Sequence, residues 1–209
     1  TTEVLLQGQG GGDTFNIWAD NTVAVVADGG QPDSGSDVLN FFAQGAATLN
    51  LGDADIDDAA TLSNPDVLYA GIETINLDAG TLTPTIVATT GDDDITVTVG
   101  DANSGSVVQG FNVQQAGQVA SNPLAPVVNY SNTAGNAVAI NLDDGQDTLI
   151  VVGNTGAQTF GVNVGTSTIT VDDAANGLGN DGTVTYTNNE SLAIFGLEGD
   201  DTIDVVSGT

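Results

Sequence analysis

A short turn motif recurs along the chain and constrains its fold more than any other feature. The motif is a glycine, an aspartate two positions later and an apolar residue two positions after that. It occurs at Gly11 to Phe15, Gly35 to Leu39, Gly91 to Ile95, Gly145 to Leu149 and Gly199 to Ile203. The aspartates stand at positions 13, 37, 93, 147 and 201, so their separations are 24, 56, 54 and 54. Glycine permits a tight turn, the aspartate is expected to point outward, and the apolar residue begins an inward-facing strand. The near-constant spacing predicts turns that stack in register.

Between these turns the apolar residues alternate with polar ones, as in Ile95 to Val99, Thr168 to Val171 and Leu192 to Ile194. A period of two is typical of β-strands. No long segment has a helical pattern, and Asp55 to Leu62 could form one or two helical turns at most. The sequence therefore predicts a nearly all-β fold.

A longer repeat contains the turn motif. Residues 76–100 align without gaps on residues 141–165, an offset of 65, and a shorter third copy covers residues 196–208. Tyr69, Tyr130 and Tyr186 occupy equivalent strands before these copies, and we expect them to form a packing ladder. We interpret residues 1–209 as a single elongated β-repeat domain. Its approximate copies and spacer loops are residues 5–50, 67–100, 127–165 and 183–208, and residues 52–66 and 101–126 respectively.

The architecture that suits such stacked units is a parallel β-solenoid of the β-helix or β-roll kind, with the spacers as lateral loops. Tandem β-sandwich repeats are the alternative. In a solenoid, the C-terminal strand from Thr202 to Ser207 and the N-terminal strand from Glu3 to Leu6 could continue the stack from one copy to the next.

The charge of the chain excludes several functions. Among 209 residues there are 28 carboxylates and no lysine, arginine or histidine, so the formal net charge is −28. Without cationic side chains the chain cannot neutralise phosphates or dock on anionic lipid, which excludes nucleic acid as a partner. No run of 18 apolar residues predicts membrane insertion. Cysteine is also absent, so the remaining chemistry is that of oxygen ligands, which favours calcium.

Dense groups of carboxylates are the first candidates for calcium binding. They are Asp92, Asp93 and Asp94; Asp143, Asp144 and Asp147; and Glu198, Asp200 and Asp201. The alternative is that these acids cap turns and solvate the surface. Like charges stacked at one corner repel each other unless a cation bridges them, which favours calcium at one or more of these turns.

A further acidic segment, with Asp53, Asp55 and Asp57, opens like an EF-hand loop. It lacks the glycine at loop position six, where Asp58 stands, and the glutamate at position twelve, where Asn64 stands. An EF-hand is therefore not expected. An irregular calcium loop and a solvated turn or short helix N-terminus remain the alternatives.

The turn motifs resemble the calcium-binding nonapeptides of repeat-in-toxin (RTX) proteins. The segment Gly8 to Asn16, GQGGGDTFN, lacks only the second glycine of the nonapeptide. The pair of segments Gly35 to Asn40 and Gly71 to Asn76 is similar to segments of bacterial surface-layer and giant surface proteins with RTX repeats. The resemblance implies secretion, calcium-dependent folding and ligands at Asp13, Asp37, Asp93, Asp147 and Asp201. No two nonapeptides are consecutive here, so each turn would supply half of a site.

These observations predict an extracellular structural protein: a calcium-stabilised β-repeat subunit of a self-assembling surface layer, sheath or filament, with itself as partner. A repeat module of a large secreted adhesin that contacts cell-surface glycans is the alternative. A carbohydrate-active β-helix enzyme is the third possibility. Catalytic activity is not expected, because the usual bases, nucleophiles and basic substrate-binding groups are absent.

Overall fold

The fold is all-β and consists of two sheets. The computed structural model describes residues 2–19, 23–30, 36–61, 66–100, 104–111, 126–173 and 180–207. Within these ranges the chain forms 19 strands and a single-turn 3-10 helix, η1 (Ala134–Asn136). The prediction of a nearly all-β fold is confirmed.

Sheet A has 11 strands, in the spatial order β1-β3-β7-β6-β5-β9-β13-β17-β16-β15-β19. Their bounds, in that order, are Thr2–Gln7, Val23–Asp28, Val67–Ala70, Asp55–Asp58, Ala47–Asn50, Thr85–Val87, Ala137–Asn141, Asn180–Thr187, Thr168–Asp173, Gln158–Asn163 and Thr202–Val206.

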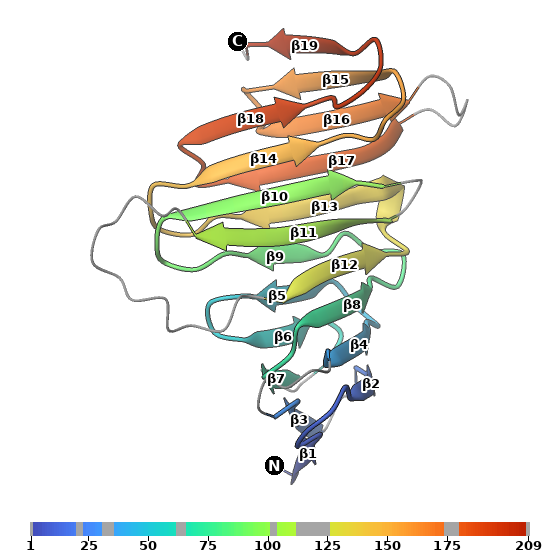
Figure 1. Ribbon diagram of the computed structural model, residues 1–209, viewed down its shortest axis with the longest axis vertical. Helices are drawn as coiled ribbons and strands as arrows, with labels where there is room; N and C mark the ends of the chain where they lie inside the picture. Colours follow the sequence, from blue (N-terminus) through green and yellow to red (C-terminus); the bar gives the residue numbers. More distant parts are fainter. Residues whose placement is uncertain are drawn as a thin grey trace.

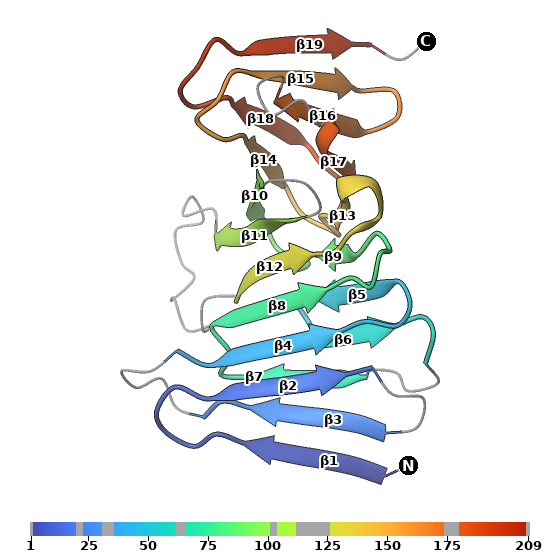
Figure 2. The same cartoon turned by 90° about the vertical axis from the view of Figure 1, so that its right-hand side faces the viewer.

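Sheet B has eight strands, in the order β18-β14-β10-β11-β12-β8-β4-β2. Their bounds, in that order, are Ser191–Phe195, Thr148–Val152, Asp93–Val99, Ser104–Phe111, Val127–Ser131, Thr74–Asp78, Val38–Phe42 and Thr14–Trp18. The two sheets lie face to face along most of the molecule, with strands running across its long axis (Figures 1 and 2).

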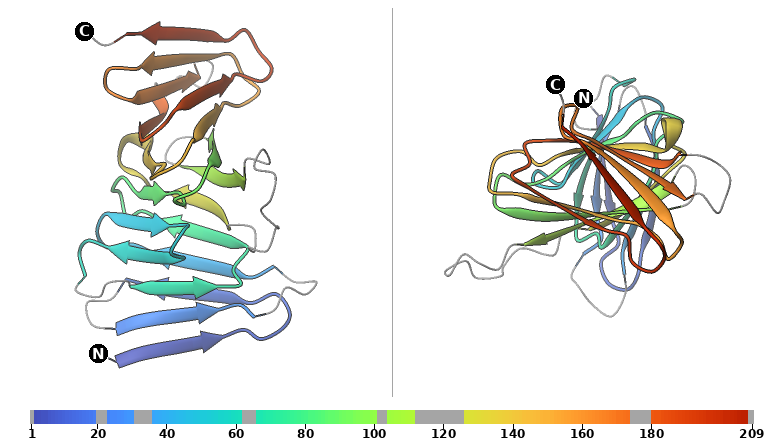
Figure 3. Two further views of the ribbon diagram at one scale, coloured as in Figure 1. Left: turned by 90° about the vertical axis from the view of Figure 1, so that its left-hand side faces the viewer. Right: turned by 90° about the horizontal axis from the view of Figure 1, so that it is seen from above.

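The chain builds both sheets together by passing from one to the other. β1, β3 and β7 are parallel neighbours in sheet A, and β2, β4 and β8 are parallel neighbours in sheet B. The two termini consequently lie at opposite ends of an elongated, twisted stack (Figures 1 and 3). For example, β2 of sheet B separates β1 from β3 in the sequence, and β3 of sheet A separates β2 from β4.

Three antiparallel triplets interrupt this alternation. In each, the first strand lies two strand positions away from the sheet formed so far. The next two strands run back toward that sheet, each antiparallel to the one before, and fill the two positions. The triplets are β5-β6-β7 in sheet A, β10-β11-β12 in sheet B and β15-β16-β17 in sheet A. Two of the central strands fall in segments predicted as spacer loops. Within residues 52–66 the segment Asp55–Asp58 is strand β6, not a loop or helical turn, and within 101–126 the segment Ser104–Phe111 is strand β11. Residues 62–65, 101–103 and 112–125 of these spacers lie outside the described residues.

The triplets explain the sequence repeat with its offset of 65 residues. Ile75 corresponds to Ile140, and Ile95 corresponds to Phe160, at that offset. The first member of each pair lies in one sheet and the second in the other, in β8 and β13 or in β10 and β15. The repeat unit is therefore a module of five strands, and successive modules exchange the roles of the two sheets.

The core lies between the inner faces of the sheets. Alternate residues are buried along most strands, as in β10, where Ile95, Val97 and Val99 face inward. The largest fully buried side chains include Phe41 and Phe160, and each such side chain contributes about 1.5–3 kcal/mol by burial. Tyr69, Tyr130 and Tyr186 are buried in equivalent triplet strands, but β7, β12 and β17 are not neighbours. The predicted tyrosine ladder is therefore wrong.

Sheet A extends beyond sheet B at both ends of the stack. At the N-terminal end β1 and β3 lie beyond β2, and at the C-terminal end β15 and β19 lie beyond β18 (Figure 2). All five residues of β19 are exposed. Ile203 and Val205 lie beside the buried Phe160 and Val162, yet they are 49% and 66% exposed because no strand of sheet B covers them.

Candidate functional site

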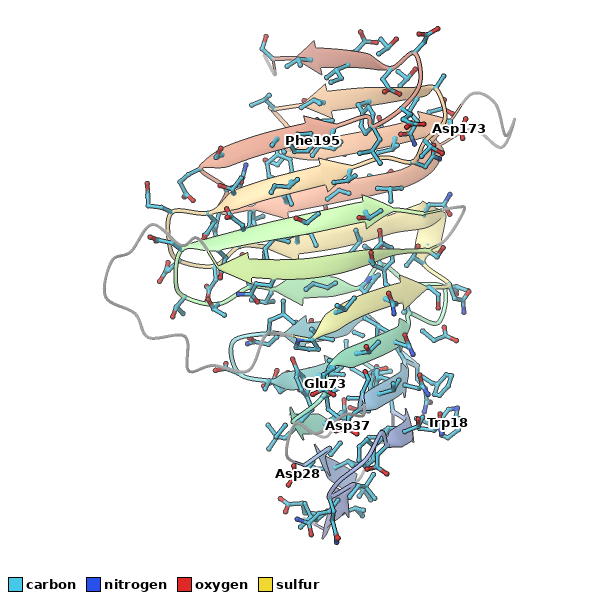
Figure 4. All side chains as sticks on the ribbon, viewed as in Figure 1. Trp18, Asp28, Asp37, Glu73, Asp173 and Phe195 are labelled. Atoms are coloured by element: carbon cyan, nitrogen blue, oxygen red, sulfur yellow. The ribbon has the colours of Figure 1, made fainter. Side chains whose placement is uncertain are left out.

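The predicted calcium-binding aspartates occupy stacked corners, where the chain turns into a strand of sheet B or sheet A. At the N-terminal end the corner residues are Asp13, Asp37 and Glu73. The backbone N–H of Asp13 donates to Asp37 Oδ1 at 2.7 Å, and the N–H of Asp37 donates to Glu73 Oε2 at 2.6 Å. Figure 4 labels Asp37 and Glu73 at this position. We call this arrangement the N-terminal acid ladder.

The same arrangement recurs further along sheet B. The N–H of Asp93 donates to Asp147 Oδ1 at 2.8 Å, and the N–H of Asp147 donates to Glu190 Oε2 at 2.7 Å. We call this the C-terminal acid ladder. In sheet A, the N–H of Gln158 donates to Asp201 Oδ1 at 3.0 Å. Within Gly156 to Phe160, Gln158 occupies the position that aspartate has in the five turn motifs, and its Oε1 accepts the Asn154 N–H at 2.9 Å.

The ladders contradict the expectation that the turn aspartates point outward. Asp37, Asp93 and Asp147 are buried, with exposed fractions of 3%, 0% and 1%. A buried backbone N–H requires an acceptor, and a carboxylate at each corner supplies one to the neighbouring coil. Asp93 also accepts hydrogen bonds from the Thr89 N–H at 2.9 Å and from the Gln109 side chain at 2.6 Å. These three acids hold the turns together through their hydrogen bonds.

Asp147 has the most perturbed carboxyl group of these ladders. Its pKa is raised from 3.8 to about 6: burial is the largest cause, the charges of Asp93, Glu190 and Asp92 also raise the pKa, and the hydrogen bond from the Asp93 N–H opposes the shift. Its Oδ2 is buried and has no hydrogen-bond partner among the described residues. Protonation of Asp147 is therefore linked to folding.

The acidic segment around β6 brings further carboxylates together. Burial raises the pKa of Asp55, and the charges of Asp57 and Asp53 add to the increase. Asp58 is buried and accepts the N–H groups of Gln44, at 2.6 Å, and Gly45, at 2.9 Å. This segment is therefore an interior strand of sheet A, paired with β5 and β7, that carries closely spaced acids. The EF-hand-like position at Asn64 lies outside the described residues.

The remaining predicted ligands lie at the surface or at its margin. Asp92 Oδ1 accepts the Gln146 N–H at 3.0 Å, whereas Asp144, Glu198 and Asp200 are exposed. Asp94 and Asp143 are partly buried. In the part of the chain that the structure describes, no three carboxylates converge closely enough to form a ready metal site.

The sequence pattern did not lead us to predict a third ladder, which consists of asparagines on the outer face of sheet B. The side-chain amides of Asn16, Asn40, Asn76 and Asn129 are linked in a row, each Nδ2 donating to the Oδ1 of the preceding asparagine at 2.7–2.9 Å. The signal was present, because each asparagine precedes an inward-facing apolar residue by one position in its strand. We call these four residues the asparagine ladder. It ends beside a hollow of about 530 Å³.

Comparisons with known proteins found no relatives: no family model, no curated protein and no solved structure matches the chain. Across the described ranges, no helix has the length and apolar character needed to cross a lipid bilayer. Functional conclusions therefore rest on the physical chemistry of the chain itself.

Proposed function

We propose that this protein is an extracellular structural protein, a calcium-stabilised subunit of a self-assembling surface layer, sheath or filament. In this proposal the two sheets form a flattened, RTX-like β-solenoid whose coils are the repeating unit of a larger stack. The observation that supports it best is the state of the two ends. Each end presents sheet edges and uncovered apolar side chains where a further coil would fit.

The apolar side chains at these ends are exposed to an unusual degree for a folded chain. Among the inward-facing side chains that no opposite strand covers, Val4 of β1 is 40% exposed at the N-terminal end, and Ile203 and Val205 of β19 are 49% and 66% exposed at the C-terminal end. Trp18 lies on β2 and Phe195 on β18, the two end strands of sheet B (Figure 4). Open strand edges with apolar neighbours favour pairing with a further strand. An assembly of copies would bury both features.

Calcium is proposed because the chain supplies no positive charge of its own. Copies that each carry a formal charge of −28 repel one another, and divalent cations bound by carboxylates reduce that repulsion. The buried ladder acids already have backbone donors, so the exposed acids are the more accessible ligands. Glu198, Asp200 and Asp204 lie exposed at the C-terminal end, and Glu3 lies exposed at the N-terminal end.

The test is sedimentation velocity and circular dichroism on the 209-residue chain with calcium, then with excess chelator, against sodium chloride of matched ionic strength. We expect large, β-rich species with calcium that dissociate on chelation and do not form in sodium chloride. Polymers that form equally well in sodium chloride would reduce the role of calcium to screening. Monomers under every condition would contradict the proposal.

A glycan-binding adhesin repeat is a second candidate, favoured by the hollow beside the asparagine ladder. Its lining carries amide and hydroxyl groups from Asn76, Thr98, Ser106, Asn129 and Ser131. Such uncharged groups suit neutral sugars, whose hydroxyls both donate and accept hydrogen bonds. Binding of neutral polysaccharides that is lost in Asn129→Ala, but retained in Asn163→Ala, would support this candidate.

A further inference from the structure

The unequal lengths of the two sheets constrain how copies can stack. Sheet A has 11 strands and sheet B has eight, a difference of three. Two of the three triplets belong to sheet A, and so do the outermost described strands, β1 and β19. Because strands are spaced about 4.8 Å apart, sheet A is about 14 Å longer than sheet B.

A straight stack, in which sheet A continues sheet A of the next copy, would repeat this mismatch at every junction. The shorter column would then contain a gap of about 14 Å per copy, with unpaired backbone groups on both sides of it. A half-turn about the long axis removes the gap. Sheet A of one copy then continues sheet B of the next, and both columns contain the same number of strands after every two copies.

The half-turn also keeps all strand directions parallel. Apart from the central triplet strands β6, β11 and β16, strands of the two facing sheets run in opposite directions across the long axis, and a half-turn reverses that direction while it exchanges the sheets (Figure 1). The same exchange of sheets relates successive five-strand modules within the chain. The junction would therefore repeat a relation that the fold already uses internally.

The corner residues set the register of the junction. In the parallel pairs of sheet B, the first inward-facing apolar residue of each strand lies beside that of its neighbour, as Phe15 beside Leu39 and Leu149 beside Leu192. Applied to the junction, this rule puts Leu192 beside Val4 and Ile203 beside Phe15 of the next copy. Ala193 and Leu5 then become neighbours on one outer face, and Asp204 and Asn16 become neighbours on the other.

Two polar features at the N-terminal end fit this register. Asp13 is the first member of its ladder, and its Oδ2 is buried without a hydrogen-bond partner among the described residues. The corner residue that would stack on it is Asp201, which accepts the Gln158 N–H as Asp37 accepts the Asp13 N–H. In addition, Asn16 begins the asparagine ladder, and its Nδ2 would donate to the Asp204 carboxylate as each later asparagine does to the one before it.

We propose that copies of this chain stack head to tail with a half-turn, so that β18 pairs with β1 and β19 pairs with β2 of the next copy. The inference rests on the proposed function, since it specifies the contact through which the subunits assemble. It differs from the simplest expectation of the sequence, in which the last strand, β19, would pair with the first strand, β1.

Cysteine cross-linking distinguishes the two arrangements, because the chain has no native cysteine. Directly opposed residues on paired strands have Cα atoms about 5 Å apart, within disulfide range. Three double variants are needed. Leu5→Cys with Ala193→Cys and Asn16→Cys with Asp204→Cys report the half-turn, and Leu5→Cys with Asp204→Cys reports the straight stack. The single-cysteine variants measure random dimerisation, and circular dichroism identifies variants that fail to fold.

We expect both half-turn pairs to form covalent ladders of dimers, trimers and longer species under mild oxidation in calcium. They should react at least about tenfold faster than the straight-stack pair, since opposed cysteines have a high effective concentration. Ladders from the straight-stack pair alone, or polymers without ladders from any pair, would overturn the half-turn while leaving self-assembly intact. A wild-type chain that remains monomeric would instead overturn the proposed function.

Discussion

Replacement of Asp147 by asparagine should stabilise the protein near neutral pH. The carboxyl group of Asp147 is buried, and its pKa is raised from 3.8 to about 6, which corresponds to about 3 kcal/mol of unfavourable interaction for the ionised form. Asparagine keeps the Oδ1 that accepts the Asp93 N–H at 2.8 Å and removes the charge. We therefore expect Asp147→Asn to raise the free energy of unfolding by up to about 3 kcal/mol at pH 7.5.

The pH dependence follows from the same shift. The folded chain binds a proton at Asp147 as the pH falls through about 6, whereas the unfolded chain binds it only near pH 3.8. Stability contributed by this group therefore increases as the pH falls from above 6 to about 4 and is lost again as the pH rises. In Asp147→Asn this increment should be missing, so the wild type and the variant should converge at low pH.

Urea denaturation in chelator, at pH 7.5 and at pH 4.5, measures both quantities. Asp147→Ala is the matched control: it removes the charge and the acceptor together, and it should be about 1–3 kcal/mol less stable than Asp147→Asn because the buried Asp93 N–H loses its partner. An asparagine variant that is destabilised at pH 7.5 as strongly as the alanine variant would refute this reasoning.

Three further predictions concern the stacked turns and their cations. Gly29→Ala should destabilise the fold by about 1–3 kcal/mol, because the new Cβ would meet the backbone oxygen of Gly71, whereas Gly91→Ala, with its nearest atom 3.5 Å away, should be close to neutral in thermal denaturation. Asn40→Ala should cost about 1–2 kcal/mol in the same assay, because it breaks the hydrogen bonds to Asn16 and Asn76; an unchanged melting temperature would show that the asparagine ladder adds no stability. Chelation should disperse the assemblies but leave the β-sheet circular dichroism of the chain largely unchanged, because the buried ladder acids are held by backbone N–H groups. Complete unfolding on chelation would instead indicate calcium ions inside the turns.

The period of the sequence predicted the strands and their inward faces, but it could not predict which strands pair. Ile95 and Val97 alternate with threonines, so their inward orientation follows from the sequence. Alternation carries no information about neighbours, and the strands β6 and β11 therefore read as parts of loops. Two spacings were also superimposed in the sequence. The 54-residue spacing from Asp93 to Asp147 joins neighbours in one sheet, whereas the 65-residue offset from Ile95 to Phe160 joins equivalent strands of opposite sheets.

The candidate site shows a similar limit. The recurrence of aspartate at the turns was visible, and the stacking of Asp13 on Asp37 and of Asp93 on Asp147 agrees with the predicted register. The direction in which the aspartate side chains point could not be predicted from the sequence, because an aspartate near a glycine can bind a cation outside the turn or accept backbone N–H groups inside it. Glu190, which completes the C-terminal acid ladder, stands outside the turn motif, whereas Glu73 stands in Gly71 to Ile75 with a glutamate in the place of the aspartate. Only the pairing of the strands brings them to the corners.

The most direct test of the account is electron microscopy of the 209-residue chain at high concentration in calcium, with helical reconstruction. The account predicts filaments with strands perpendicular to the axis and a rise of about 45 Å per copy, the mean length of the two sheets at about 4.8 Å per strand. Successive copies should be related by a half-turn plus the accumulated twist of the sheets. Single particles one chain long under these conditions would contradict it.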